Sequence, residues 1–392
     1  MRQPVAEPSL AHLQVWLAVS CFTASLFVRA VDPLVPVIAR DLHVPAGQVA
    51  LLGSAFAFPF GLMQLVWGPV GDRFGRSGVI RICMAIISLG GVASALWPAW
   101  DWQFAMRVVC GVASAGIFPA TIALIGDRVA LEERQAVLAR MLGATISGGL
   151  AGAIGAGFLV EWLGWRGVFL LYGVVCAVTT VAVMRVLPRS ARSATAPAHG
   201  VLHGFRAVLR NRRAWICFSA VFCEGVFIFG LMPFVAVLLA ARGENSPAIA
   251  GLVIAAFPLG GIIYSAAAGR LMGWLGGRGL MGVGGLAAAA ALLATATGLP
   301  WQGDFAAFML LGFGFYSLHN SLQVQATELA PAFRGSAVAL HGSSFMTGQA
   351  VGPIWWGAAL NLAGPALALC LGAGVIAIVG LLCGKLLGEP AR

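Results

Sequence analysis

Long apolar stretches recur along the whole chain and constrain its fold more than any other feature. Windows of roughly 18 or more residues with at most one charge are typical of helices that cross a lipid bilayer. Only 10% of the 392 residues are charged, and the mean hydropathy is +0.91, whereas soluble proteins carry about 25% charged residues. Strands of a membrane barrel would instead alternate over about 10 residues. The sequence therefore predicts an all-α membrane protein.

The apolar stretches divide the chain into twelve expected transmembrane helices, arranged as two six-helix halves. We expect an N-terminal half over residues 1–187, a basic cytoplasmic linker over residues 188–213 and a C-terminal half over residues 214–392. The expected spans cover residues 12–39, 48–70, 78–98, 102–126, 138–162, 167–187, 214–240, 248–271, 279–299, 304–326, 337–361 and 365–387.

Basic residues are distributed unequally between the two sides of this topology. With a cytoplasmic N-terminus, that side holds nineteen of the 24 lysines and arginines, and the opposite side holds only Arg40, Arg166 and Arg242. Cytoplasmic loops are enriched in positive charge, so we expect both termini in the cytoplasm. The net charge of +10 then reflects topology rather than nucleic-acid binding. Arginine greatly outnumbers lysine, which is typical of a GC-rich bacterial genome and favours the inner (plasma) membrane.

The two halves repeat one another at an offset of about 200 residues. Duplicated halves place a binding site between them, near the middle of the bilayer. Three matches occur in the same order: Gly68…Asp72…Arg76 with Gly269…Gly273…Arg278, Asp127…Arg134 with Glu328…Arg334, and Gly148…Gly152…Gly157 with Gly348…Gly352…Gly357.

A short charged turn connects the second and third expected spans, and it contains Gly68, Asp72, Arg73, Gly75 and Arg76. We expect Asp72 at the start of a helix, where free backbone amides favour a carboxylate, and glycines that allow a sharp turn. The two arginines are expected to pair with acidic groups or with carbonyls that end neighbouring helices.

This turn is similar to the signature of the major facilitator superfamily, and the resemblance extends over the full length of the chain. Arg107 and Gly111 resemble its second motif, in the fourth span. The resemblance implies a twelve-helix transporter in which the turn latches the outward-facing state. The alternative is a topological turn whose arginines only fix the orientation. The expected latch residues are Gly68, Asp72, Arg73, Gly75, Arg76 and Arg134.

Glycines in the fifth and eleventh spans form an expected helix-packing motif, because small residues let helices approach closely. The fifth-span copy resembles a motif associated with antiporters, although Ala153 stands where that pattern has proline. Packing alone and a specific antiport role both remain open. The motif comprises Gly148, Gly152, Gly157, Gly348, Gly352 and Pro353.

Ionisable residues inside spans are costly and are therefore functional candidates. Arg29 and Asp32 share one helical face of the first span, and Pro33 can open the helix there. Asp32 and Arg107 lie at similar depths, about 12 and 9 Å from the outer end. We expect Asp32 to pair with Arg29 or Arg107 and to take up and release a proton. A static ion pair is the alternative.

Glu224 lies in the middle of the seventh span and has no evident partner there. A lone carboxyl at that depth is neutral unless it is paired or hydrated, because burial penalises the charged form. We therefore expect Glu224 to bind a proton or to contact the substrate, or else to form a neutral hydrogen bond within the bundle.

One polar face is expected in the tenth span, where Tyr316, His319, Asn320 and Gln323 are spaced i, i+3, i+4 and i+7. Such a face must contact protein or water rather than lipid. We expect it to line the substrate cavity, with interhelical hydrogen bonding as the alternative. His341 and Gln349 in the eleventh span are expected to have structural roles.

These features predict a secondary transporter that moves a small organic solute by alternating access, with proton-coupled efflux (antiport) as the expected mode. The alternatives are a proton-coupled uptake symporter of an organic anion or metabolite and, more remotely, a non-transporting membrane sensor.

The chain has no Walker A motif, no metal-binding motif and no large loop for an enzyme active site. We expect no enzyme activity, no cofactor and no metal. The expected partners are a small-molecule substrate, protons and the lipid bilayer, and we expect a monomer.

Overall fold

The computed structural model describes residues 10–187 and 201–387, and these residues fold almost entirely into helices. The predicted linker over residues 188–213 lies partly outside the described residues, and its described part forms α7 and the start of α8. The elements are α1 (Leu10–Arg29), η1 (Asp32–Leu34), α2 (Val35–Leu42), α3 (Ala46–Phe74), α4 (Arg76–Leu96), α5 (Trp100–Arg128), α6 (Leu131–Val186), α7 (Val201–Leu209), α8 (Arg212–Phe227), η2 (Phe229–Phe234), α9 (Val235–Ala240), α10 (Pro247–Ala296), α11 (Trp301–Glu328), η3 (Pro331–Phe333) and α12 (Arg334–Leu386).

Three of the longest helices each contain two membrane passages. Non-helical glycines divide them: Gly164 in α6, Gly276 in α10 and Gly364 in α12, all with positive φ. Within residues 10–187 and 201–387, eight helical stretches are long and apolar enough to cross a membrane, and these three double ones are among them. Helix α11 has 28 residues and is therefore also long enough to cross a bilayer. With α11 included, the elements account for the twelve predicted spans.

The turn between α3 and α4 differs from the prediction. Helix α3 continues through Asp72 to Phe74, so the expectation that Asp72 begins a helix is wrong. The chain turns at Gly75 instead, where φ is 91°, and the Gly75 N–H closes α3 by donating to the Gly71 carbonyl. Only glycine adopts this φ without strain. The related turn at Gly276, 201 residues later, also has a positive φ of 60°.

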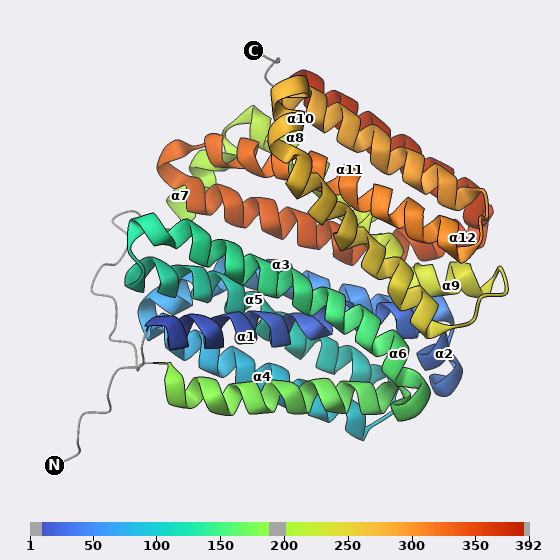
Figure 1. Ribbon diagram of the computed structural model, residues 1–392, viewed down its shortest axis with the longest axis horizontal. Coiled ribbons are helices and arrows are strands. Elements are labelled where there is room, and N and C mark those ends of the chain that lie inside the picture. The colour runs from blue at the N-terminus through green and yellow to red at the C-terminus, as the bar shows by residue number, and fades with distance from the viewer. Residues whose placement is uncertain (1–9, 188–200, 388–392) are drawn as a thin grey trace.

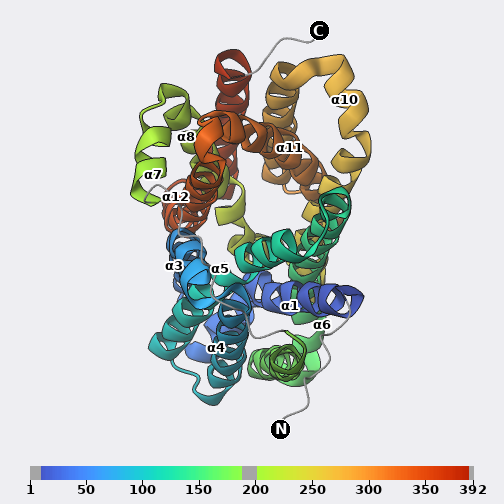
Figure 2. The same ribbon diagram turned by 90° about the vertical axis from the view of Figure 1, so that its left-hand side faces the viewer.

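The helices form two groups that lie against each other (Figure 1). Elements α1 to α6 make one group and α7 to α12 the other, and Figure 2 shows both groups from one end. Buried hydrophobic residues fall into two clusters, one from residues 13–187 and one almost wholly from residues 208–387. Only Ala50 and Ala153 of the first group join the second cluster. The interior between the groups is therefore distinct from either core.

We call the end where α6 finishes at Val186 and α7 begins at Val201 the linker end, and the end with the turns at Gly164 and Gly364 the opposite end (Figure 1). At the opposite end η1 contacts η2, and α2 contacts α9. These contacts join the two groups of helices on that side.

The first and seventh spans are broken at matching positions. In the first span α1 ends at Arg29 and a 3₁₀ turn follows at Asp32–Leu34, which confirms the local opening expected at Pro33. In the seventh span α8 ends at Phe227 and a 3₁₀ segment follows at Phe229–Phe234 around Pro233. The two prolines are 200 residues apart. Proline removes a backbone donor and disrupts an α-helix, so both halves share this break.

Glycines permit the closest helix contacts within each group. A Cβ at Gly148 or Gly152 would meet the α1 backbone at Phe22 or Leu26. In the second group, a Cβ at Gly348 or Gly352 would meet the α8 segment at Phe222 or η2 at Gly230. Gly157 instead approaches the α10 backbone at Pro247, across the two groups. These helices touch backbone to backbone, as in other small-residue membrane interfaces.

We expect Gly152→Ala to destabilise the protein by about 1–3 kcal/mol, because the added methyl overpacks the α1–α6 contact. The matched control is Gly149→Ala in the same helix, where an added Cβ meets nothing within 4 Å. Thermal unfolding in detergent measures both variants. Equal melting temperatures for the two would contradict the close-packing role of Gly152.

Candidate functional site

Two adjoining cavities lie where the two groups of helices meet. The smaller is about 170 Å³ and is lined by residues that include Asp32, Phe56 and Pro353. The larger is about 460 Å³ and extends to Gln323 near the linker end of α11. Arg29, Phe229 and Gln349 line both. Together the cavities form one candidate binding site, to which both groups of helices contribute.

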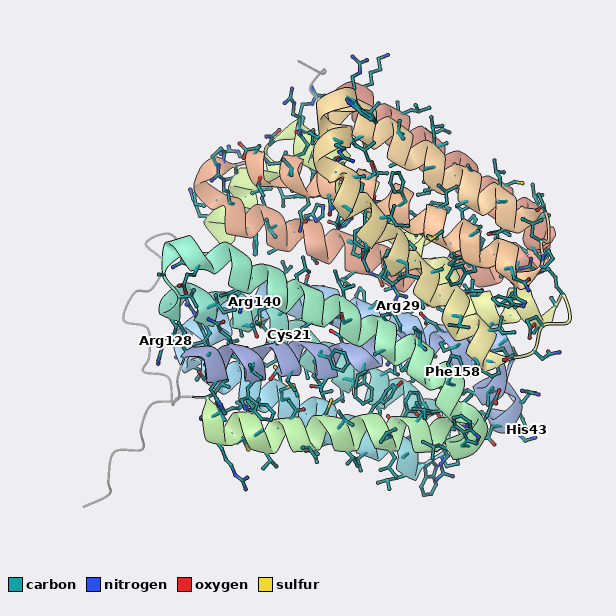
Figure 3. The ribbon with its side chains drawn as sticks, viewed as in Figure 1. Cys21, Arg29, His43, Arg128, Arg140 and Phe158 are labelled. Atoms are coloured by element: carbon teal, nitrogen blue, oxygen red, sulfur yellow. The ribbon has the colours of Figure 1, made fainter. Side chains whose placement is uncertain are left out.

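Arg29 is the central polar residue of this site. Figure 3 places it between the two groups of helices, with Arg128 and Arg140 toward one end and His43 at the other. Its Nη1 lies 3.2 Å from Asp32 Oδ2, and its Nη2 donates to Gln349 Oε1 at 3.0 Å. The guanidinium also lies 4.6 Å from the ring centroid of Phe229. Arg29 thus joins its own carboxylate partner to two residues of the other group.

Of the two pairings expected for Asp32, the structure contains the one with Arg29. Asp32 is only 2% exposed, and a buried carboxylate without a cation is strongly destabilised. The break at η1 places this side chain in the wall of the smaller cavity.

Arg107 has a different set of partners. Its Nε donates to the Leu52 carbonyl at 3.2 Å, and its Nη1 donates to the Phe27 carbonyl at 2.6 Å. The guanidinium stacks on the Phe56 ring at 4.5 Å. These contacts tie α5 to α3 and α1. Arg107 is buried and lines neither cavity. Its guanidinium therefore acts on the site through the backbone of the helices that it holds.

The polar face expected in the tenth span lies in α11. Tyr316, His319, Asn320 and Gln323 all line the larger cavity. Aromatic rings surround them, and these include Phe315 of α11 itself, Phe257 of α10 and Phe345 of α12. The wall is therefore mainly apolar and aromatic, with a few polar groups from one helix, which is the usual composition of a small-molecule site.

Glu224 is fully buried in α8, and its partner comes from α11. Its Oε2 lies 2.7 Å from His319 Nδ1, while its Oε1 has no hydrogen-bond partner. Glu224 lines neither cavity, whereas His319 lines the larger one. The ring of His341 from α12 lies 5.0 Å from that of His319. The sequence singled out Glu224 and His319 separately, and the fold brings them together.

The sequence matches a known family. The family model described as the Major Facilitator Superfamily matches residues 17–353, which is most of the chain. The chain belongs to the major facilitator superfamily. It is accordingly a multi-pass membrane transporter with twelve spans in two pseudo-symmetric six-helix halves, and not an enzyme. The earlier resemblance, drawn from the charged turn and the glycine repeats, is confirmed.

Individual relatives within the superfamily are distant. A multi-drug resistance efflux pump PmrA homolog of Lactococcus lactis is 27% identical over 328 residues, covering 80% of this chain and 79% of that protein. The 3-(3-hydroxy-phenyl)propionate transporter of Escherichia coli is 28% identical over 367 residues, covering 87% and 86%. A crystal structure of a D-xylose-proton symporter superposes with a TM-score of 0.79 at 15% identity, covering 96% of this chain and 97% of that one. This last likeness concerns the fold alone.

The charged turn of this major facilitator protein contacts the end of α5. Arg76 forms an ion pair with Asp127, and Arg134 donates to the Gly126 and Val129 carbonyls at 2.8 and 3.2 Å. Arg73 is exposed, with its guanidinium 5.7 Å from the Phe74 ring. The Asp72 side chain lies outside the described part of the structure. Arginines thus hold the carbonyl end of α5 at the linker end.

Two residues of the site were not predicted to be functional. Gln349 was expected to be structural and Phe229 was not singled out, yet both contact Arg29 across the halves. The 200-residue repeat contained a usable signal, because Phe229 corresponds to Arg29 and Pro233 to Pro33. Equivalent positions near a pseudo-twofold axis lie close together, so the repeat could have paired Arg29 with Phe229.

We expect Asp32 to be coupled energetically to Arg29 more strongly than to Arg107. A double-mutant cycle of Asp32→Asn with Arg29→Gln should give an interaction energy of about 0.5–3 kcal/mol. The matched cycle with Arg107→Gln should give less than about 0.5 kcal/mol, because Arg107 is satisfied by backbone carbonyls. Unfolding free energies in mixed detergent micelles measure both cycles. A larger coupling to Arg107 would reverse the assignment.

Proposed function

We propose that this transporter is a proton-coupled efflux antiporter for small amphipathic organic molecules. The observation that carries the proposal is the buried Asp32–Arg29 pair in the cavity wall, with Arg29 also bound to Gln349 of the other half. In this scheme Asp32 is the proton-coupling carboxyl, Arg29 is its regulatory partner, and Arg107 supports them through its backbone contacts.

A proton at Asp32 would change contacts between the halves. Protonation removes the charge that holds Arg29 in its ion pair, and the freed guanidinium must then find other acceptors. Because Arg29 also donates to Gln349 and stacks on Phe229, its rearrangement alters the contact between the two halves. Alternating access in this fold is the rocking of one half against the other. Proton binding and rocking are thus linked through one side chain.

The cavity wall supports the choice of substrate class. Its aromatic and aliphatic lining suits the apolar part of an amphipathic molecule, while Tyr316, Asn320 and Gln323 offer hydrogen bonds for a polar part. The name of the Lactococcus lactis relative, a multi-drug resistance efflux pump homolog, supports efflux as the direction of transport.

The membrane, the oligomeric state and the orientation of the protein belong to the same proposal. We place it in the plasma membrane as a monomer, with both termini and the linker end in the cytoplasm, because the basic residues gather on that side. The functional units are the halves over residues 1–187 and 214–392, joined by the basic segment 188–213. Tight glycine contacts keep each half rigid while it rocks.

A second candidate function is proton-coupled uptake of an organic anion, and one observation favours it. Arg29 lines both cavities, so protonation of Asp32 would leave an uncompensated cation facing the substrate. A carboxylate could then replace Asp32 as the partner of Arg29. The Escherichia coli relative is named for a phenylpropionate, which is a carboxylate of this kind.

We expect Asp32→Asn to abolish solute-driven proton movement in proteoliposomes, because asparagine binds no proton. Liposomes containing a trapped pH dye are given amphipathic cations, organic anions and sugars in turn. Antiport makes the lumen more alkaline as a solute enters, whereas symport makes it more acidic. The sign of the dye signal therefore separates the two candidate functions.

The matched control for Asp32→Asn is Asp304→Asn. Asp304 is also 2% exposed and lies 2.7 Å from an arginine, Arg242, but it lines neither cavity. This variant should keep substrate-linked proton movement in whatever fraction folds. Unchanged coupling in Asp32→Asn would reduce the Asp32–Arg29 pair to a static contact.

The charged turn and Arg134 of α6 are proposed to form a latch between conformations, and the latch comprises Gly68, Asp72, Arg73, Gly75, Arg76 and Arg134. Asp127→Asn removes the carboxylate that pairs with Arg76. We expect this variant to slow transport about 10-fold while substrate binding stays within twofold, because a latch controls the conformational step rather than the cavity. Parallel flux and binding titrations measure the two effects. Equal losses in both would contradict a latch.

A further inference from the structure

We propose that Glu224, His319 and His341 form a second proton-binding site, in the C-terminal half, which exchanges a proton with the larger cavity independently of Asp32. In this site Glu224 and His319 share one proton, and His341 is a positioning residue for the His319 ring. The inference rests on the proposed function only in assuming that the protein moves protons.

The charges around Glu224 require a proton there. Glu224 is 0% exposed, and among the described residues its only ion-pair partner is His319. No arginine or lysine in the described part of the chain neutralises it. Desolvating an uncompensated carboxylate is costly. A single proton, held on either the carboxyl or the imidazole, makes the pair neutral overall. The pair is therefore most stable with one proton bound.

His319 gives this buried proton a route to the cavity. Its ring contacts Glu224 on one side, and the residue also lines the larger cavity beside Tyr316, Asn320 and Gln323. An imidazole can accept a proton at one nitrogen and release one from the other. Glu224 does not reach either cavity itself, so His319 is the residue through which its proton is exchanged.

His341 completes the site from α12. It is 2% exposed, and its Nε2 has no hydrogen-bond partner. Its ring lies in an edge-to-face arrangement 5.0 Å from the His319 ring, while Phe315 stacks on His319 at 4.7 Å. A buried nitrogen without a partner is costly, and here it can accept a hydrogen bond when the His319 ring rotates. His341 therefore positions the His319 ring, through the present ring contact and through the hydrogen bond that a rotated ring would donate.

An aromatic cluster separates this site from the Asp32–Arg29 pair. Phe229 packs on Arg29 on one side and on Phe315 and Phe345 on the other, with ring centroids 4.9 and 5.0 Å apart. Phe315 in turn stacks on His319. The rings exclude a direct contact between the two pairs, so each pair can hold its own proton.

Other titratable groups face the site from several helices. They are Cys217 and Cys223 of α8, Tyr316 of α11 and Cys383 of α12, with Tyr264 of α10 beside Asn320, and Arg29 of α1, which acts on Tyr316. Thiols and phenols stay neutral over the physiological range, and Arg29, the one cation among these described groups, is paired with Asp32. Glu224 and the two histidines are therefore the groups that titrate.

The test is a pH titration of the full-length protein in detergent, followed by infrared difference spectroscopy of protonated carboxyl groups. Wild-type protein should show a carboxyl band that Glu224→Gln removes and Asp32→Asn retains. In His319→Gln the band should persist to a higher pH than in the wild type, because an amide, unlike an imidazole, cannot take the proton from the carboxyl. In His341→Phe the band should titrate with its midpoint moved by about one pH unit, equivalent to about 1.4 kcal/mol.

Proton flux in dye-loaded proteoliposomes then separates this inference from the proposed function. Without added solute, Asp32→Asn together with Glu224→Gln should remove the proton exchange that each single variant retains in part, whereas solute-driven proton movement is already lost in Asp32→Asn alone. If Glu224→Gln leaves the infrared spectrum unchanged while Asp32→Asn abolishes all proton flux, the second site is overturned and the proposed function stands. If Asp32→Asn leaves proton flux unchanged and Glu224→Gln abolishes it, the second site is supported and the proton-coupling role of Asp32 is rejected. An unmoved midpoint in His341→Phe removes His341 from the site.

Discussion

A charged side chain inside an apolar bundle needs a partner, and this requirement organises the interior of the transporter. Each buried charge meets it differently. Asp32 is paired with Arg29, Arg107 is held by two backbone carbonyls and an aromatic face, and Glu224 contacts His319. Only the first and last of these arrangements contain a carboxyl group that a proton would neutralise. In the proposed scheme the proton-dependent contacts are therefore these two pairs, one in each half.

The backbone makes these contacts possible. Glycines in the fifth and eleventh spans bring those helices against the first and seventh spans, where a Cβ at Gly152 or Gly352 would clash with backbone. Prolines then break the first and seventh spans at equivalent positions, which places Arg29 and Phe229 opposite each other. Within each half the helices are packed closely, and the two breaks bring Asp32 and Phe229 to the space between the halves.

Much of the fold could be predicted from the sequence because its signals are local. Hydropathy located the spans, and the repeat indicated two halves. The polar face of α11 followed from helical spacing, since Tyr316 to Gln323 lie within two turns. The prediction for Asp72 was wrong because glycines on both sides of it offered two places for the turn, and only Gly75 is used. A local pattern could not choose between them.

The sequence by itself determined the membrane class, the twelve spans, the family and most of the ionisable residues of the site, because lipid makes each apolar span and each buried charge conspicuous. The tertiary structure alone decided the partners. Glu224 and His319 are 95 residues apart, and Arg29 and Gln349 are 320 apart. Such pairs depend on which helices pack together and on how each helix is rotated. Neither property is encoded in a single span, so it was the packing of the two halves that turned isolated polar residues into a site.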